Sequence, residues 1–430
     1  MVTTSQQPEI GYQRVSIPRP PAQWWEIIPV SLWFITTFIP FPNDELLLYP
    51  LALYFAGFFA LRYRQMLPLA LKCWPLFLVP ALTAISMFWS PVGGQALRFG
   101  IMMSLTAVIA IYIGGRLTGR QITLAVFLAC AVSVVVAIPE STSLDDELGL
   151  YTQKNLFAFR MMLALLLSLG VALDSKQMIA ARALAWLLIP VTFYLVFIAE
   201  SATALLISAA NIMILGSIWL FWINLRHVQH LRTMVLSVAL LLGLVGYLMF
   251  MNMPNNIFVQ SVLESLGKDA TLTGRTDLWA NALRISEAHP WLGVGAEGFW
   301  QPWVGEAETI LDWNFKDSGS KFSFHSVYYE VLVHLGYIGV GLMSVQIIWC
   351  FFNCIRGWSA DQNIVNSMLL LIGIITVITS FTESYLYSVF DINAILFFCA
   401  AIIPISNSAR MREVMIPVAL DGSAPTNAAV

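Results

Sequence analysis

Chemistry is most strongly indicated in the segment HSVYYEVLVHLGYIG, residues 325–339, which begins with an ionisable side chain and continues as an apolar run. A helix turns by about 100° per residue, so His325, Tyr328 and Gly336 fall on one side of it and His334 roughly on the other. Histidine titrates near neutral pH without large perturbation, which makes His325 the best candidate for a general base. The alternative is a histidine that only forms hydrogen bonds at a membrane interface.

The same helix face carries Tyr328, a candidate substrate contact, and two small residues, Gly336 and Gly339. Together they predict a smooth, glycine-lined groove below the imidazole. Small residues at this spacing usually let a second helix approach closely, and they can instead leave room for a lipid tail. His334, on the opposite side, is interpreted as a packing residue.

A second candidate site lies upstream, in LTGRTDLWANALRISEAHPWLGVG. The pattern predicts a short amphipathic helix that begins near Asp277 and stops before Pro290. Arg275 then lies beside a helix N-terminus, where free N–H groups and the helix dipole favour an anion such as a phosphate. A guanidinium there completes a diphosphate site, unless Arg275 is an interfacial or capping residue. Trp279 offers a flat face for a sugar ring, although tryptophans also gather at membrane interfaces.

The elements that position these residues follow from composition. The chain has 430 residues, of which 58% are hydrophobic and 11% charged, whereas soluble domains are about 25% charged. This composition predicts an all-α integral membrane protein. The net charge of -3 shows no basic excess, which argues against a nucleic-acid partner. The cysteines show no zinc-binding spacing, and we expect neither a metal nor a cofactor.

Apolar runs of about 20 residues predict about twelve transmembrane helices. One connection is far longer than a link between helices requires, which suggests a functional external loop bearing short helices. The predicted parts are a cytoplasmic tail at 1–23, helices 1–9 within 24–251, a periplasmic loop at 252–324, helices 10–12 within 325–406 and a cytoplasmic tail at 407–430. The individual ranges are 24–41, 45–61, 68–89, 97–115, 121–138, 155–174, 181–199, 202–223, 231–251, 327–352, 363–382 and 389–406.

Most Lys and Arg residues fall in alternate connections, and cytoplasmic loops are the ones that accumulate positive charge. The pattern predicts that both termini are cytoplasmic. Arg98, Lys154 and Arg160 are exceptions at or just inside the external boundary. A cation in an apolar span is costly and is a candidate for function, while snorkelling of the side chain toward headgroups is the alternative. Glu383 and Asp391 flank the last external turn, where they either orient the base or an acceptor hydroxyl, or reflect simple helix-end polarity.

With these motifs, the sequence resembles the O-antigen ligase and Wzy-type polymerase superfamily of bacterial inner-membrane glycosyltransferases. HSVYYEVLVHLGYIG fits the family pattern of His, then Asn, Ser or Gln, nine residues and GxxG. GRTDLWANALRISEAHPWLGVGAEGFW is similar to the external-loop signature of ExoQ-type exopolysaccharide polymerases, and KNLFAF and SATALL also look like that subgroup. The stretch from Arg284 to Gly295 fits the polymerases' pattern of Arg, ten residues and Gly, which makes Arg284 a further candidate contact.

The resemblance implies a GT-C-like fold and a metal-independent enzyme whose active site faces the periplasm from the bacterial inner membrane. Its substrate would be an oligosaccharide or polysaccharide linked to undecaprenyl diphosphate in the lipid bilayer, and other polysaccharide assembly proteins fit the same setting as partners. In that case His325 deprotonates the acceptor hydroxyl, and Arg275 holds the diphosphate leaving group. The assignment is chemically coherent, because a departing dianion needs cationic stabilisation and the nucleophile is a weak alcohol.

One departure from the family pattern concerns a second cation. Many ligases have an arginine after the serine that corresponds to Ser201, and this chain has Ala202 there. If two cations contact the diphosphate, then Arg160, Lys154 or Arg98 must supply the second one. The departure favours the polymerase branch over the ligase branch.

The residue after the glycine pattern points the same way, because Val340 stands where ligases usually have Thr. We therefore expect a polysaccharide polymerase that moves a growing lipid-linked chain onto the next lipid-linked repeat unit. A ligase that transfers the glycan to lipid A core or to a protein is the closest alternative. A transporter or flippase of lipid-linked sugars is an alternative from another class, but transporters usually place ionisable groups near the bilayer midplane, whereas the charges here gather at one face.

Overall fold

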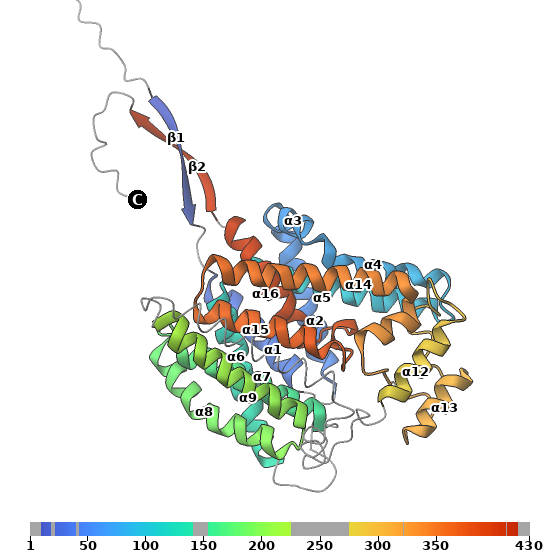
Figure 1. Cartoon of the computed structure of the whole chain (residues 1–430). Helices are drawn as coiled ribbons and strands as arrows, with labels where there is room; N and C mark the ends of the chain where they lie inside the picture. Colours follow the sequence, from blue (N-terminus) through green and yellow to red (C-terminus); the bar gives the residue numbers. More distant parts are fainter. Residues whose placement is uncertain are drawn as a thin grey trace, which may run out of the picture.

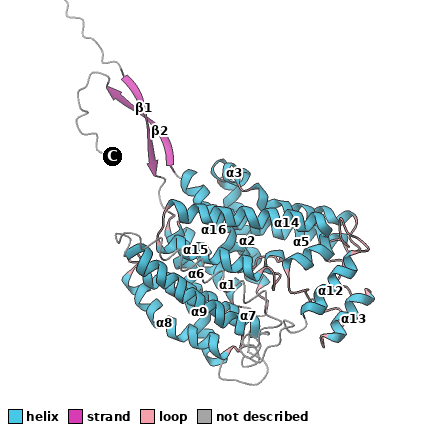
Figure 2. Cartoon of the chain, in the orientation of Figure 1, coloured by secondary structure: helices cyan, strands magenta, loops and turns pink. Residues whose placement is uncertain are grey.

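The computed structural model describes residues 10–18, 22–39, 43–140, 154–224, 275–320, 322–409 and 411–419. Helices dominate this part of the chain (Figure 2), and the longer ones lie together in one bundle with the short helices α12 and α13 at one end (Figure 1). Helices are what long apolar runs dictate, because a backbone inside lipid must satisfy its hydrogen bonds within its own segment.

The first half of the described chain is a series of helices joined mostly by short turns. Short 3₁₀ turns flank α4, and a π-helical turn continues α9. The helices are α1 (Trp24–Phe38), α2 (Glu45–Leu61), α3 (Tyr63–Lys72), η1 (Trp74–Phe77), α4 (Leu78–Ile85), η2 (Ser86–Phe88), α5 (Gly93–Arg116), α6 (Gly119–Glu140), α7 (Lys154–Leu173), α8 (Ile179–Ile198), α9 (Ala202–Ser217) and η3 (Ile218–Asn224).

The second half places two short helices before three long ones. They are α12 (Arg275–Ser286), α13 (Gly305–Trp313), α14 (Val327–Ala360), α15 (Ile364–Thr379), a 3₁₀ turn η5 (Tyr385–Tyr387) and α16 (Ile392–Ala409). Helix α12 agrees with the short amphipathic helix that the sequence predicts. It begins two residues before the predicted start and ends ahead of Pro290, with Leu278 and Ala282 buried.

Two segments that the sequence assigns to the tails pair as strands. Strand β1 (Ile10–Pro18) runs antiparallel to β2 (Met411–Ala419), with Ile10 opposite Ala419 and Pro18 opposite Met411. The pair extends as a ribbon from the end of the bundle away from α12 and α13 (Figure 1). The sequence analysis predicts no strand there.

Among the described residues, six helices are long and apolar enough to cross a membrane: α5, α6, α7, α8, α9 with η3, and α14. A seventh span results if α2 and α3, which meet at a bend of 100°, count as one. Other predicted ranges coincide with shorter apolar helices at 25–38, 74–88, 364–379 and 392–407. The predicted range 231–251 lies outside the described residues, so the structure shows a helical membrane protein, and the count of twelve stays a prediction.

Helix α7 is the most deeply buried of these six, and it packs against α6, α8 and α9. Helix α5 packs against α4 and α16, while α14 packs against α15 and α16. The short helix α12 packs against α14. Helix α14 is therefore the element that connects the loop helices to the membrane bundle.

Helix α14 is not the smooth helix that the sequence predicts. Gly336 interrupts it with φ of 65° and ψ of −167°, and a Cβ at this position would overlap the backbone of Trp291. The carbonyls of Val333 and His334 accept hydrogen bonds of 2.9 Å from the loop amides of Val294 and Gly295. Gly336 thus admits a loop rather than a second helix or a lipid tail, and the predicted groove is wrong at this point.

A buried ionic cluster holds the other end of the bundle together. The carboxylate of Glu26 in α1 is fully buried and accepts hydrogen bonds from Arg62 Nη1 at 2.6 Å and from Arg116 Nε and Nη2 at 2.8 Å each. The hydroxyl of Tyr112 donates a further bond of 3.3 Å to Glu26 Oε1. We call these four residues the Glu26 cluster. It joins α1 to α5 and to the bend between α2 and α3.

Candidate active site

His325 immediately precedes Ser326, which occupies the N-cap position of α14 without a side-chain capping hydrogen bond. Its backbone is left-handed with φ of 49°, which is uncommon for a residue with a side chain. The imidazole lies edge-on to the ring of Phe322, with 5.5 Å between the centroids, and 28% of the side chain is exposed. Within the described part of the chain, its Nδ1 is buried and has no hydrogen-bond partner. The imidazole therefore has unused hydrogen-bonding capacity on a partly accessible ring.

Glu383, in the connection between α15 and α16, faces this nitrogen. Its Oε2 is 3.7 Å from His325 Nδ1, which is longer than a hydrogen bond. Its Oε1 accepts a hydrogen bond of 2.7 Å from Nη2 of Arg275, the first residue of α12. One largely buried carboxylate thus joins the two residues that the sequence analysis predicts as catalytic. We call His325, Arg275 and Glu383 the His325 cluster.

The cluster combines the groups that an acid–base transfer needs. A neutral imidazole can take a proton from a hydroxyl, and a carboxylate a few ångströms away stabilises the imidazolium that forms. A guanidinium stabilises negative charge on a leaving group through charge-assisted hydrogen bonds. An incoming anion must compete with Glu383 for Arg275, so the carboxylate also keeps the guanidinium in place before the anion arrives.

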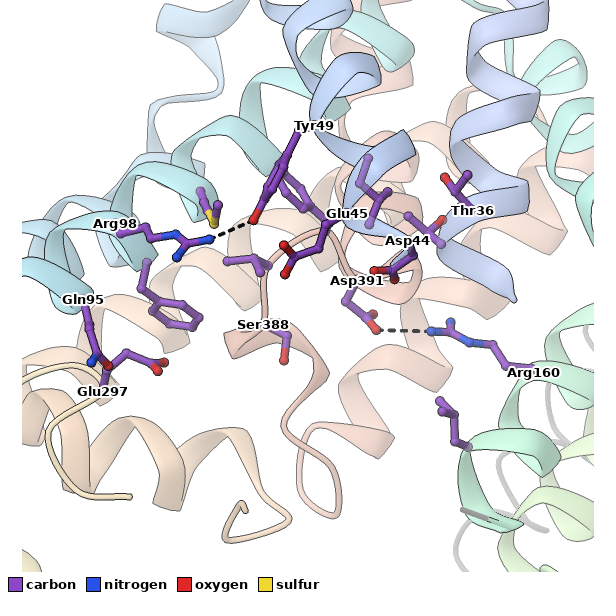
Figure 3. Close-up of a pocket in the computed structure, with 17 residues that line it drawn as sticks. Thr36, Asp44, Glu45, Tyr49, Gln95, Arg98, Arg160, Glu297, Ser388 and Asp391 are labelled. Carbon is purple, nitrogen blue, oxygen red and sulfur yellow. Dashed lines mark hydrogen bonds and ion pairs between the residues drawn. The ribbon is translucent and has the colours of Figure 1, made fainter. Parts of the chain in front are cut away.

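A cavity of about 550 Å³ is lined in part by residues 388–391 of the α15–α16 connection, and we call it the Arg98 cavity. Figure 3 shows Arg98 and Tyr49 on one wall and Arg160 with Asp391 on another. Arg98 donates a hydrogen bond of 2.8 Å to the Tyr49 hydroxyl. Arg160 is largely buried, its Nη2 is 3.6 Å from Asp391 Oδ2, and its guanidinium carbon is 5.7 Å from the centroid of the Phe38 ring. Two of the cations singled out in the sequence therefore line one cavity.

A second cavity of about 480 Å³ is lined by residues close in sequence to His325 and Glu383, and we call it the Trp300 cavity. It is lined by Phe322 and Ser323, just before His325, and by Ser384, directly after Glu383. The Arg98 and Trp300 cavities share the lining residues Gln95, Phe99, Glu297, Ser388 and Val389. The two cavities therefore adjoin, and we call them together the groove. Its lining residues extend from the buried Arg160 to Phe322 and Ser323, just before His325.

Tyr385, in the connection between α15 and α16, is close enough to Glu383 and Arg160 for both charges to affect its phenol. Burial raises the pKa of its phenol well above the usual range, and the negative charge of Glu383 acts in the same direction, while the positive charge of Arg160 opposes it. The ring packs edge-on against Phe159 with 6.0 Å between the centroids. The phenol therefore stays protonated at neutral pH and remains a hydrogen-bond donor beside the His325 cluster.

Two other residues predicted to contact the substrate, Arg284 and Trp279, interact with nearby side chains or backbone in the structure. Arg284 pairs with Glu306 of α13 at 2.7 Å, and both side chains are about half exposed. Trp279 stacks on Tyr329 with 5.3 Å between the ring centroids, and its Nε1 donates a hydrogen bond of 3.0 Å to the carbonyl of Phe324. Trp279 thus fixes α12 to α14 next to the His325 cluster. Direct contacts of Arg284 and Trp279 with a substrate remain predictions.

Two further candidates lie at helix starts. The hydroxyl of Tyr328 accepts a hydrogen bond of 3.4 Å from Ser380, and its ring packs on Phe381 with 4.9 Å between the centroids. Lys154 begins α7, but its side chain lies outside the described part of the chain. Their roles in substrate binding also remain predictions.

The contact between the buried side chains of Glu330 and His334 was not predicted from the sequence. Glu330 accepts hydrogen bonds from Trp300 Nε1 at 3.0 Å and from the Phe324 amide at 2.7 Å, and it lies 3.2 Å from His334 Nε2. His334 Nδ1 lies 3.3 Å from the Gly295 carbonyl. A glutamate inside an apolar run was the available signal, because such a charge is costly unless it is paired. The pair holds the backbone next to His325 against α14.

Comparisons with known proteins match this chain to one family and one relative. The family described as O-antigen ligase matches residues 183–344, from α8 into α14. The chain is also 26% identical over 359 residues to the exopolysaccharide production protein ExoQ of Rhizobium meliloti (strain 1021), a match that covers 80% of each protein. The resemblance to the O-antigen ligase and Wzy-type polymerase superfamily is confirmed. Together, these comparisons support the polysaccharide polymerase or ligase class.

The matched family region contains Arg275 and His325, whereas Glu383 and the arginines of the Arg98 cavity lie outside it. The structure therefore brings residues of the shared region together with residues that the family match does not cover. In the described residues, no group of three or more His, Cys, Asp and Glu side chains is arranged to hold a metal ion. Metal independence remains a prediction.

Proposed function

We propose that this protein is a bacterial inner-membrane polysaccharide polymerase. It transfers a glycan from undecaprenyl diphosphate onto a lipid-linked repeat unit at the periplasmic face. The observation that carries the proposal is the His325 cluster, in which one carboxylate joins a candidate base to a candidate diphosphate ligand. Residues close in sequence to the cluster line the groove, which is large enough for a glycan rather than a single ion.

The reaction follows from the roles of the three side chains. The acceptor hydroxyl oxygen attacks the anomeric carbon of the donor glycan, and the bond from that carbon to the phosphate oxygen breaks with its electron pair on the diphosphate. His325 takes the hydroxyl proton, and Glu383 stabilises the resulting imidazolium. Arg275 moves from Glu383 to the diphosphate as its charge develops, which lowers the barrier because the guanidinium binds the leaving group more strongly than the ester.

A second cation for the diphosphate comes from α7 in this proposal. The position of the arginine found in many ligases is taken here by Ala202, the first residue of α9. The preceding Ser201 donates a hydrogen bond of 3.4 Å to Asn155 at the start of α7. The start of α7 therefore lies beside Ala202. Lys154 is better placed to replace the arginine than Arg98, which donates to Tyr49, or Arg160, which pairs with Asp391 in a cavity lined by four carboxylates.

A ligase is the second candidate, because the matching family is described as O-antigen ligase. The same cluster would perform the same chemistry on a different acceptor, such as lipid A core or a protein. Membrane orientation belongs to the proposal as well: both termini lie in the cytoplasm, and the His325 cluster lies in the periplasm.

The test is the size distribution of lipid-linked glycan in a strain that lacks the gene, complemented with the wild type, His325→Ala or His289→Ala. The exposed His289 of the loop serves as the matched control. A polymerase leaves single lipid-linked repeat units in the deletion strain, and the wild type and the control restore long chains while His325→Ala does not. Full-length polymer retained on undecaprenyl diphosphate would instead identify a ligase.

Two other results would overturn the assignment. A glycan profile that does not change on deletion of the gene would exclude both the polymerase and the ligase. A transporter would be indicated if His325→Ala still moved lipid-linked substrate across the membrane and restored normal polymer.

A further inference from the structure

The wall of the groove is unsuited to a diphosphate. The Arg98 cavity is lined by four carboxylates and two guanidinium groups. Arg98 donates a hydrogen bond to Tyr49, and Arg160 forms an ion pair with Asp391, although its Nε has no hydrogen-bond partner among the described residues. Burial and the nearby charge of Glu45 raise the pKa of Asp44. Even with Asp44 protonated, the remaining carboxylates outnumber the cations, so the cavity repels a multiply charged anion.

The same wall suits a ligand rich in hydroxyl groups. Ionised carboxylates only accept hydrogen bonds, and each can accept several from neighbouring donors. Gln95 and Ser388, which line both cavities, supply polar groups that also donate. Phe99 and Trp300 add aromatic surface of the kind on which the apolar face of a sugar ring packs. A chain of sugars offers both surfaces at once.

Glu297 lies at the junction of the two cavities and lines both. Its backbone is left-handed with φ of 57°, a conformation that is costly for a residue with a side chain and that clusters at functional sites. The loop around it is fixed at two points. The amide of Gly295 donates to the His334 carbonyl at 2.9 Å, and Ser90 donates to the Ala296 carbonyl at 2.9 Å. The scaffold therefore holds Glu297 in a strained conformation within the groove.

We propose that this groove binds non-acidic sugars of the transferred or accepting glycan, and that Glu297 selects them by accepting hydrogen bonds from their hydroxyl or ammonium groups while repelling uronate sugars. The inference rests on the proposed function, and it makes Glu297 a specificity-determining residue rather than a catalytic one. The diphosphate then binds at the His325 cluster, and the sugars extend through the Trp300 cavity into the Arg98 cavity.

The test is binding of three tetrasaccharides to the full chain in lipid nanodiscs, measured by saturation-transfer NMR and titration. The probes are cellotetraose, a glucosamine tetramer and tetragalacturonate. We expect the first two to bind the wild type and tetragalacturonate to bind at least about tenfold more weakly, because like charges oppose its entry. Glu297→Gln should weaken the binding of the first two by about tenfold, the effect of losing one charge-assisted hydrogen bond.

Three further variants make the result specific. Gln95→Ala, on α5, should also weaken binding, because Gln95 lines the same junction from another element. Glu287→Gln, an exposed acid of the loop, should bind like the wild type. His325→Ala should bind the tetrasaccharides like the wild type even if it cannot form polymer. The proposal would be overturned if tetragalacturonate bound the wild type as tightly as the other two probes. It would also be overturned if Glu297→Gln bound the probes like the wild type, or if the wild type bound none of them.

The groove and the proposed function can fail separately. If glycans in the deletion strain are normal but tetrasaccharide binding still depends on Glu297, the polymerase assignment fails and the groove stands. If single lipid-linked repeat units accumulate but binding does not depend on Glu297, the groove proposal fails and the polymerase stands.

Discussion

Two carboxylates in this protein each lie between two nitrogen-bearing side chains, and their surroundings differ. Glu26 is fully buried, and Arg62, Arg116 and Tyr112 all bind it within hydrogen-bond distance. Glu383 makes one short bond to Arg275 and stands 3.7 Å from a histidine nitrogen that has no hydrogen-bond partner among the described residues. The Glu26 cluster is saturated, whereas the His325 cluster has binding capacity left.

The difference separates a structural ion cluster from a candidate site. A buried charge that is completely paired rigidifies the fold but has nothing left to offer a ligand. An incompletely satisfied polar group in a native protein calls for an explanation, and a neighbouring cavity supplies one. Of the two clusters, only the His325 cluster has close sequence neighbours among the residues that line the cavities described above.

Of the changes considered, loss of Arg275 should have the largest effect on the rate of glycan transfer. Arg275→Ala should lower the rate of glycan transfer by about 10² to 10³, the range for losing one group that stabilises transition-state charge. Lys316→Ala removes an exposed cation of the same loop and should leave the rate unchanged. The measurement is extension of lipid-linked repeat units by protein in vesicles. A rate for Arg275→Ala within threefold of the control would remove Arg275 from the mechanism.

The second prediction concerns the saturated cluster. Glu26→Gln leaves two partly buried guanidinium groups without a counter-charge, which should lower the free energy of unfolding by about 3 kcal/mol. The transfer rate per folded molecule should be unchanged, because none of the cavities described above is lined by a residue of the Glu26 cluster. Unfolding of the purified variant in nanodiscs, together with its activity per folded protein, checks both halves. If Glu26→Gln lost transfer rate but kept the stability of the wild type, the Glu26 cluster would be functional rather than structural.

Gly336 should give an intermediate effect. Its backbone conformation is essentially restricted to glycine, so Gly336→Ala should cost about 1 to 3 kcal/mol of stability, and the new Cβ should displace the loop that carries Glu297. Gly341→Ala is the control, because a Cβ there meets nothing within 4 Å. Thermal unfolding of both variants is the measurement. Equal midpoints would show that the break in α14 is not rigid.

Arg284 should show the smallest effect. Its ion pair with Glu306 is about half exposed, and such surface pairs contribute at most about 1 kcal/mol. Arg284→Ala should therefore change stability little and the transfer rate by less than about threefold, because the pair lies on the loop surface. A rate loss comparable to that of Arg275→Ala would place Arg284 at the substrate, as its place in the sequence pattern suggests.

The sequence predicts those features that depend on local spacing. The helix ranges and the position of α12 follow from apolar periodicity and helix start signals, and Arg275 and His325 indeed share a partner. That partner is Glu383, one of two residues named from the sequence as able to orient the base. It lies 108 residues after Arg275, and nothing in the spacing along one chain places it within reach. The break at Gly336 was missed for a similar reason. A glycine in an apolar run fits a continuous helix, and only the loop that crosses it shows the break.

The most direct test of the account is Glu383→Gln, assayed for transfer rate and thermal midpoint beside Glu26→Gln. The amide keeps the shape of Glu383 but removes the charge that orients Arg275 and stabilises the imidazolium. The account predicts a rate at least about tenfold lower with a midpoint near that of the wild type, the opposite of Glu26→Gln. A wild-type rate for Glu383→Gln, or a loss of stability without a loss of rate per folded molecule, would contradict a functional His325 cluster.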